Sequence, residues 1–79
     1  MAAQPLSAFR PGETARLGPL SALDPDLARE LAALRLLSGE VLTLVAAVGG
    51  GGPVLVQGSG GVFALGRRLA DSLTAEVPA

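Results

Sequence analysis

The stretch EVLTLVAAVGGGGPVLVQGSGGVFAL, residues 40–65, carries the clearest strand pattern in this chain. It contains three apolar runs, and two groups of glycines separate them. Alternation of side chains along such runs is typical of half-buried β-strands, and short glycine-rich links are typical of the turns between strands. The stretch therefore predicts a meander of three strands.

The same alternation predicts which side chains of the meander face the core. The inward set is Leu42, Leu44, Val54, Val56, Phe63 and Leu65. The opposite face then carries four aliphatic side chains, Val41, Val45, Leu55 and Val62. No charged residue lies between Glu40 and Arg67. We expect this outer face to join protomers of a homo-oligomer, with Leu55 near the contact, or to dock on a partner. The alternative is that the helix or the N-terminal segment covers part of it.

The glycines at 49–52 also raise the question of a phosphate-binding loop. A Walker A loop needs a lysine, and the chain has none. The dinucleotide pattern needs a third glycine five residues after the first, where the chain has Val54 or Leu55. Both kinds of site open a helix, whereas Pro53 leads into a predicted strand. The glycines therefore predict a hairpin turn, and we expect no cofactor.

Composition excludes several classes of function. The chain has 79 residues, the length of one small domain, and its formal net charge is −1. This balance argues against a nucleic-acid-binding domain, which usually carries clustered basic residues. Cysteine and histidine are absent, so the sequence offers neither a thiolate metal site nor a histidine base for a nucleophile. We expect a protein that is not an enzyme and holds no metal.

The charge-free run from Val41 to Gly66 is long enough for a membrane span, which needs about 20 apolar residues. Glycines and Pro53 interrupt it, so we do not expect direct membrane insertion. The beginning, MAAQPLSAF, has neither the basic region nor the apolar core of a signal peptide. We expect a soluble, cytoplasmic chain.

The segments around the meander predict two helical pieces and two more strands. Residues 14–17 alternate like a short strand, and residues 22–39 form the clearest helix. Asp24 and Pro25 fit the N-cap and first helical position, and Leu27, Leu31 and Leu34 form an apolar stripe. Residues 66–73 are long enough for one helical turn, and TAEV (residues 74–77) fits a closing edge strand. A small, strand-rich chain of this kind favours a compact, partly open barrel.

From about Leu6 to Val77 the chain resembles the FeoA family, small cytoplasmic proteins of bacterial ferrous-iron uptake. The resemblance rests on PGETARL, on LARELAALRLLSGEVLTL, and on GGPVLVQGSGGVFALGRRLADSL. The second stretch is similar to the family's L-x-x-L-G-L-x-P-G pattern, and the third to its G-D-P hairpin and the segment after it. The sequence departs from the family at four positions. Arg35 stands where the family usually has glycine, Ser38 where it has proline, Gly52 where it has aspartate, and Gly66 where it has arginine.

The resemblance implies an SH3-like β-barrel with one helix inserted after the first strand and a short helical turn near the C-terminus. Residues 1–79 would form this one domain, with residues 1–5 as a flexible tail. It also implies an accessory role beside the membrane iron transporter FeoB, through the transporter's cytosolic domain. A related SH3-like module forms the C-terminal part of iron-dependent repressors, which gives the second hypothesis, a regulatory interaction module or structural oligomer.

Three arginines complete the set of residues that we expect to face a partner. They are Arg35, Arg67 and Arg68. Arg67 and Arg68 could also bind a small anion or nucleotide, although a neighbouring pair of like charges is more often a solvated turn.

Overall fold

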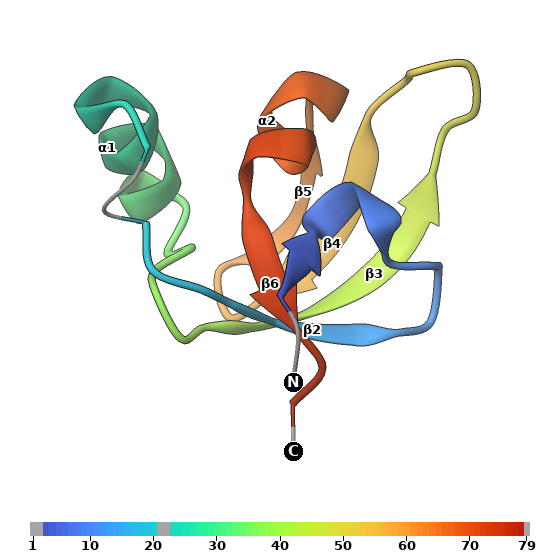
Figure 1. Ribbon diagram of the computed structural model, residues 1–79, viewed down its shortest axis with the longest axis horizontal. Helices are drawn as coiled ribbons and strands as arrows, with labels where there is room; N and C mark the ends of the chain where they lie inside the picture. Colours follow the sequence, from blue (N-terminus) through green and yellow to red (C-terminus); the bar gives the residue numbers. More distant parts are fainter. Residues whose placement is uncertain (1–2, 21–22, 79) are drawn as a thin grey trace.

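The computed structural model describes residues 3–20 and 23–78. These residues form a mainly β structure, a six-stranded antiparallel sheet with two short α-helices (Figure 1). The strands are β1 (Gln4–Pro5), β2 (Thr14–Leu17), β3 (Val41–Ala47), β4 (Val54–Gly58), β5 (Gly61–Leu65) and β6 (Thr74–Glu76). The helices are α1 (Pro25–Ala33), α2 (Arg67–Ser72) and a short 3-10 helix, η1 (Leu6–Ala8). Across the sheet the order is β1-β6-β2-β3-β4-β5.

The predicted meander is confirmed as β3, β4 and β5, each antiparallel to the next. The glycines at 49–52 form the hairpin link between β3 and β4, as predicted. The N–H of Val48 donates to the carbonyl of Pro53 at 3.0 Å and closes this link. Gly50 and Gly51 have φ of 70° and 80°, a left-handed backbone that glycine adopts without a steric penalty.

One irregularity in β3 changes the predicted faces. Strict alternation would place Ala46 on the same face as Leu42 and Leu44. Instead the register shifts between Leu44 and Ala46, so that Ala46 pairs with Leu55 and Val45 is the extra residue. Such a bulge adds one residue to a strand and turns the following side chains over.

The last strand corrects the predicted edge position. We expected residues 74–77 to close the sheet as an edge strand, but β6 lies between β1 and β2. Ala75 pairs with Gln4 on one side and with Leu17 on the other. The edge is instead β1, because Gln4 and Pro5, which we expected in a flexible tail, add a strand to β6. Residues 1 and 2 of that predicted tail lie outside the described residues.

Helix α1 is shorter than the predicted residues 22–39 and follows β2, the strand predicted at residues 14–17; β1, which was not predicted, precedes both. Its beginning is as predicted, because the Asp24 carboxylate accepts a hydrogen bond from the N–H of Asp26 at 2.8 Å and Pro25 occupies the first turn. The helix ends at Ala33, since Arg35 adopts a left-handed φ of 62° that no helix continues. Leu31 is the buried residue of the stripe, and Leu27 and Leu34 are only half-buried.

The core lies between the inner face of the sheet and the helices. Leu42, Leu44, Val54, Val56 and Leu65 are buried, which confirms these five inward positions. Phe63 is half-buried at the border of the core. Leu6 and Phe9 are also buried, although no pattern in the sequence indicated it. Helix η1 packs against α2 and contributes Leu6 to the core.

The sheet has two edges, β1 and β5, and no ladder joins them within the described residues. Hydrogen-bonded closure into a complete barrel is therefore not seen in this part of the chain.

No helix within residues 3–20 and 23–78 has the length and apolar character needed to cross a membrane.

Candidate functional site

The outer face of β3, β4 and β5 presents the aliphatic side chains that the sequence indicated. Val41, Val45 and Val62 are 45%, 44% and 55% exposed. Leu55 is half-buried, and its cross-strand neighbours are two alanines, Ala46 and Ala64. Because alanine side chains are short, the Leu55 side chain extends further from the sheet than those of its two neighbours.

The four residues do not form one unbroken patch. Thr43 pairs with Gln57, and this polar pair lies along the strands between Val41 and Leu55. Val62 is the cross-strand neighbour of Gln57, which lies two residues from Leu55 along β4. Val45 precedes Ala46, the partner of Leu55, and Val62 lies diagonally from Leu55 on the neighbouring strand, whereas Val41 lies beside Arg16 of β2.

A second surface, which the sequence analysis did not identify, is a cleft between α1 and the β5–α2 segment. Two cavities of about 350 and 400 Å³ form it, and they share Glu30, Gly66 and Leu69. In Figure 1, the ribbon of helix α1 lies apart from the ribbons of β5 and α2. The lining of the first cavity is mostly apolar: Glu30, Leu31, Ala33, Leu34, Ala64, Leu65, Gly66 and Leu69.

A close contact joins α1 to the hairpin between β4 and β5. A Cβ atom at Gly60 would lie 3.0 Å from the carbonyl oxygen of Leu34 and 3.6 Å from the Cβ of Arg35. Only glycine allows this approach without a shift of the helix end. The C-terminal end of α1 therefore lies close against the hairpin.

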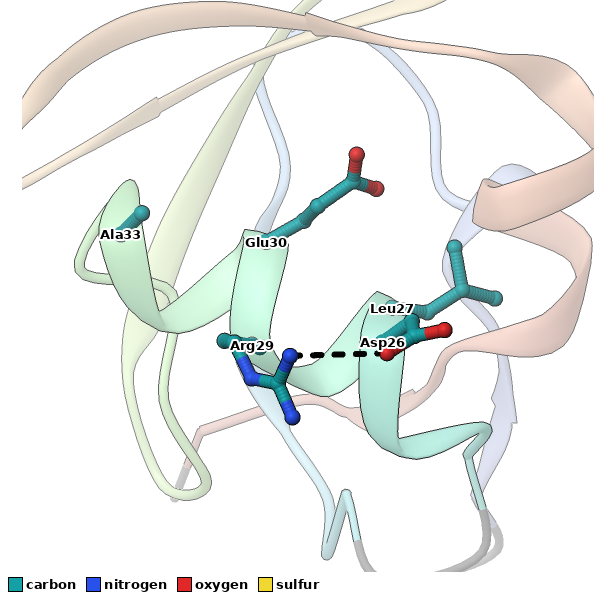
Figure 2. A pocket seen from close by; sticks show the side chains of 5 residues that line it. All are labelled: Asp26, Leu27, Arg29, Glu30 and Ala33. Carbon is teal, nitrogen blue, oxygen red and sulfur yellow. Dashed lines mark ion pairs between the residues drawn. The ribbon is translucent and has the colours of Figure 1, made fainter.

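A third, more open surface on α1 adjoins the cleft and shares Leu27, Glu30 and Ala33 with it. Asp26, Leu27, Arg29, Glu30 and Ala33 line it (Figure 2). The ion pair between Arg29 and Asp26 measures 3.6 Å, and both side chains are mostly exposed, so it contributes little to stability. In Figure 2, Leu27 and Glu30 extend from α1 away from Arg29. Their i, i+3 spacing places them on one helix face, and both residues also line the second cavity of the cleft.

The three arginines have three different positions. Arg67 is half-buried and engaged within the chain, because its Nε donates to the carbonyl of Gly52 at 3.0 Å and its Nη2 to the carbonyl of Val48 at 2.9 Å. Arg68 is exposed and lines the cleft. Arg35 is exposed at the end of α1, in the left-handed conformation. Of the two neighbours Arg67 and Arg68, only Arg68 presents its charge to the cleft.

The described residues hold no group of three or more acidic, cysteine or histidine side chains that could bind a metal ion.

The Ser7 hydroxyl donates a hydrogen bond to the Asp71 carboxylate and so links η1 to α2. Two surface features of this part of the chain are the outer sheet face and the cleft.

Comparison with known protein families gives a match over almost the whole described chain. Residues 4–77 match the family model for the FeoA domain. A search of curated proteins found no match.

Solved structures share the fold. The FeoA protein from Chlorobium tepidum is 26% identical, with a TM-score of 0.84 over 96% of this chain and 71% of that one. The crystal structure of an iron uptake regulatory protein, FeoA, is 21% identical, with a TM-score of 0.80 over 96% of this chain and 97% of that one. A manganese-dependent transcriptional repressor is 24% identical, with a TM-score of 0.86 over 96% of this chain but only 41% of the repressor.

Proposed function

This chain belongs to the FeoA domain family, and from that premise we propose that it is a non-enzymatic accessory protein of ferrous iron uptake. The observation that carries the proposal is the match of residues 4–77 to the family model. We propose that it acts in the cytoplasm by contact with the cytosolic domain of a FeoB-type membrane transporter. In the same proposal, the sheet belongs to the SH3-like barrel class with an inserted helix.

The exposed side chains support a role in contact. Val45 and Val62 project from a face that carries no charge on β3, β4 or β5. Burying an aliphatic side chain of this size contributes about 1.5–3 kcal/mol when complete. We propose that this face is where the chain meets the transporter or a second copy of itself. In the same proposal Arg35, at the end of α1, and Arg68, at the cleft, also face the partner.

The proposal is tested by capture of a purified FeoB-type cytosolic domain on the immobilised chain. We expect wild type to retain the domain and Val62→Glu to weaken retention, because a charge would replace an apolar contact. Val77→Glu is the matched control, since Val77 is similarly exposed at 49% but lies after β6. Equal loss with both variants would place the contact elsewhere, and no retention by wild type would overturn the transporter contact.

A second candidate function is a regulatory interaction module that is not tied to the transporter. The likeness to the manganese-dependent repressor, with a TM-score of 0.86, favours it. Titration with Fe²⁺ or Mn²⁺ in the absence of any partner distinguishes the two. Tight binding would favour the regulatory module, and binding that requires the transporter domain would favour the accessory protein.

A further inference from the structure

The two edges of the sheet differ in their protection. β1 is two residues long and contains Pro5, which has no N–H to donate. β5 is five residues long, and its sequence GVFAL contains neither a charge nor a proline. Proteins usually blunt exposed edges with short strands, charges or prolines, since an unprotected edge pairs with other chains. The sequence of β5 has none of these devices.

The hydrogen bonds of the neighbouring strands show which groups of β5 are free. The N–H of Leu44 donates to Glu13, and its carbonyl accepts from Gly12, both at 2.8 Å. Leu44 therefore bonds toward the side of β2, and, because alternate residues of an antiparallel strand bond to opposite sides, Thr43 bonds toward β4. Its register partner there is Gln57.

The same alternation continues into β5. Because Gln57 bonds toward β3, Val56 bonds toward β5, where its partner is Phe63. The N–H and C=O groups of Val62 and Ala64 consequently point away from the sheet. Outside the β4–β5 ladder, no backbone hydrogen bond from the described residues reaches residues 61–65.

The cleft meets this free edge at the C-terminal end of β5. Ala64 and Leu65 form one wall of its first cavity, and Leu31 and Leu34 of α1 form the opposite wall. At about 350 Å³ the cavity is within the range of small ligand pockets, about 300–1,000 Å³. Glu30 lines both cavities, whereas Arg68 lines only the second, so Glu30 is the one charged residue of the first cavity. Within the described residues Glu30 takes no part in an ion pair; Arg29 and Asp26 form the pair that is present.

We propose that the free edge of β5 binds an extended peptide segment of a partner protein, which adds a strand to the sheet inside the cleft. The N–H and C=O groups of Val62 and Ala64 bond its backbone, as in other cases of strand addition. Apolar side chains at alternate positions of the segment pack against α1, and a basic side chain lies beside Glu30. The inference does not depend on the identity of the transporter.

The test uses a synthetic six-residue peptide, acetylated and amidated, in which a lysine at position 1 and valines at positions 3 and 5 alternate with threonines, so that the lysine and the valines share one face. Two further peptides carry N-methyl groups on alternate residues, one on the odd and one on the even positions. Strand addition uses the N–H groups of one set only. We therefore expect one methylated peptide to bind at least about tenfold more weakly than the parent, and the other to bind within about twofold of it.

Binding is followed by NMR of the labelled full chain, and we expect the amides of Val62 and Ala64 to shift and to exchange more slowly. Equal binding of both methylated peptides would show docking of side chains without strand addition and would overturn the proposal. Absence of binding up to about 1 mM peptide would overturn it as well.

A pair of variants tests the edge from the protein side. Ala64→Pro removes the outward N–H, at an edge position where proline is tolerated, and Ala64→Ser keeps it. We expect the proline variant to lose peptide binding by at least about tenfold and the serine variant to retain it. If Ala64→Pro does not fold, the two methylated peptides decide the question. Loss of self-association in Ala64→Pro, with no peptide binding by wild type, would mean that a second copy occupies the edge and would overturn the proposal.

Discussion

The guanidinium of Arg67 bonds to the carbonyl oxygen of Val48, with 2.9 Å between its Nη2 and that oxygen. A second bond, from Nε to the carbonyl of Gly52, reaches the other end of the glycine link between β3 and β4. One side chain from the first turn of α2 therefore holds both ends of that link. The rigid fork of an arginine suits this geometry, whereas a lysine offers a single point charge.

Arg67→Lys should therefore loosen the link while leaving the sheet intact. We expect the free energy of unfolding to fall by about 1 kcal/mol, because the side chain is only half-buried. The amides of Val48 and Gly52 should exchange faster with solvent. Arg68→Lys is the control, since Arg68 makes no contact with the link, and it should leave both amides unchanged. Unaltered exchange in Arg67→Lys would show that the glycine link is held without this arginine.

Arg35→Gly should stabilise the chain. Arg35 is held at a φ of 62°, which costs a residue with a Cβ atom about 1–2 kcal/mol, and glycine adopts this conformation freely. Glycine gains entropy in the unfolded chain, so the net gain should be about 0.5–1 kcal/mol. Thermal unfolding measures it, and Arg29→Gly inside α1 should instead lose about 1 kcal/mol. A lower melting temperature for Arg35→Gly would indicate that the arginine side chain makes a stabilising contact.

Gly60→Ala should destabilise the chain, because its Cβ would press on the carbonyl oxygen of Leu34 at 3.0 Å. That oxygen belongs to the backbone at the end of α1 and not to a flexible side chain. We expect a loss of about 1 kcal/mol, which lowers the melting temperature by about 4–8 °C in a chain of this size. Gly49→Ala is the matched control, since nothing lies within 4 Å of a Cβ there. Equal melting temperatures for the two variants would mean that α1 yields at its end.

The wild-type chain should form a homo-oligomer through the outer sheet face. Leu55 stands between two alanines, so its side chain can reach a second copy. Light scattering should give a particle of more than one chain, and Leu55→Glu should shift it toward the monomer with the fold retained. Val77→Glu tests whether any added charge has this effect. A wild type that stays monomeric at high concentration would rule out this use of the face.

Local patterns predicted the meander well. Alternation alone placed Leu42, Leu44, Val54, Val56 and Leu65 in the core, because each strand has one face against the helices. The pattern could not reveal the bulge at Val45, since a bulge depends on how two strands register and not on the composition of either. The start of α1 was also predictable, because Asp24 and Pro25 act within one turn of it.

Contacts between distant segments were not predictable in this way. Leu6 and Phe9 lie in a stretch without periodicity, and their burial depends on α2 and β6 being in place. The contact of Arg67 with the glycine link, and the separation of α1 from α2 that opens the cleft, likewise depend on tertiary position. One missed feature did have a signal: the family's glycine at the position of Arg35 indicated a left-handed residue, and hence an early end to α1.

The position of β6 has a consequence for the order in which the chain folds. β1 and β2 are close in sequence, yet they do not pair, because β6 separates them and Ala75 pairs with both. The N-terminal strand therefore has no partner until residues 74–76 arrive, whereas β3, β4 and β5 pair through short loops. Loop-closure entropy favours the local hairpins first. Pulse-labelled amide exchange should find the meander protected before β6, and simultaneous protection would show that the sheet assembles in one step.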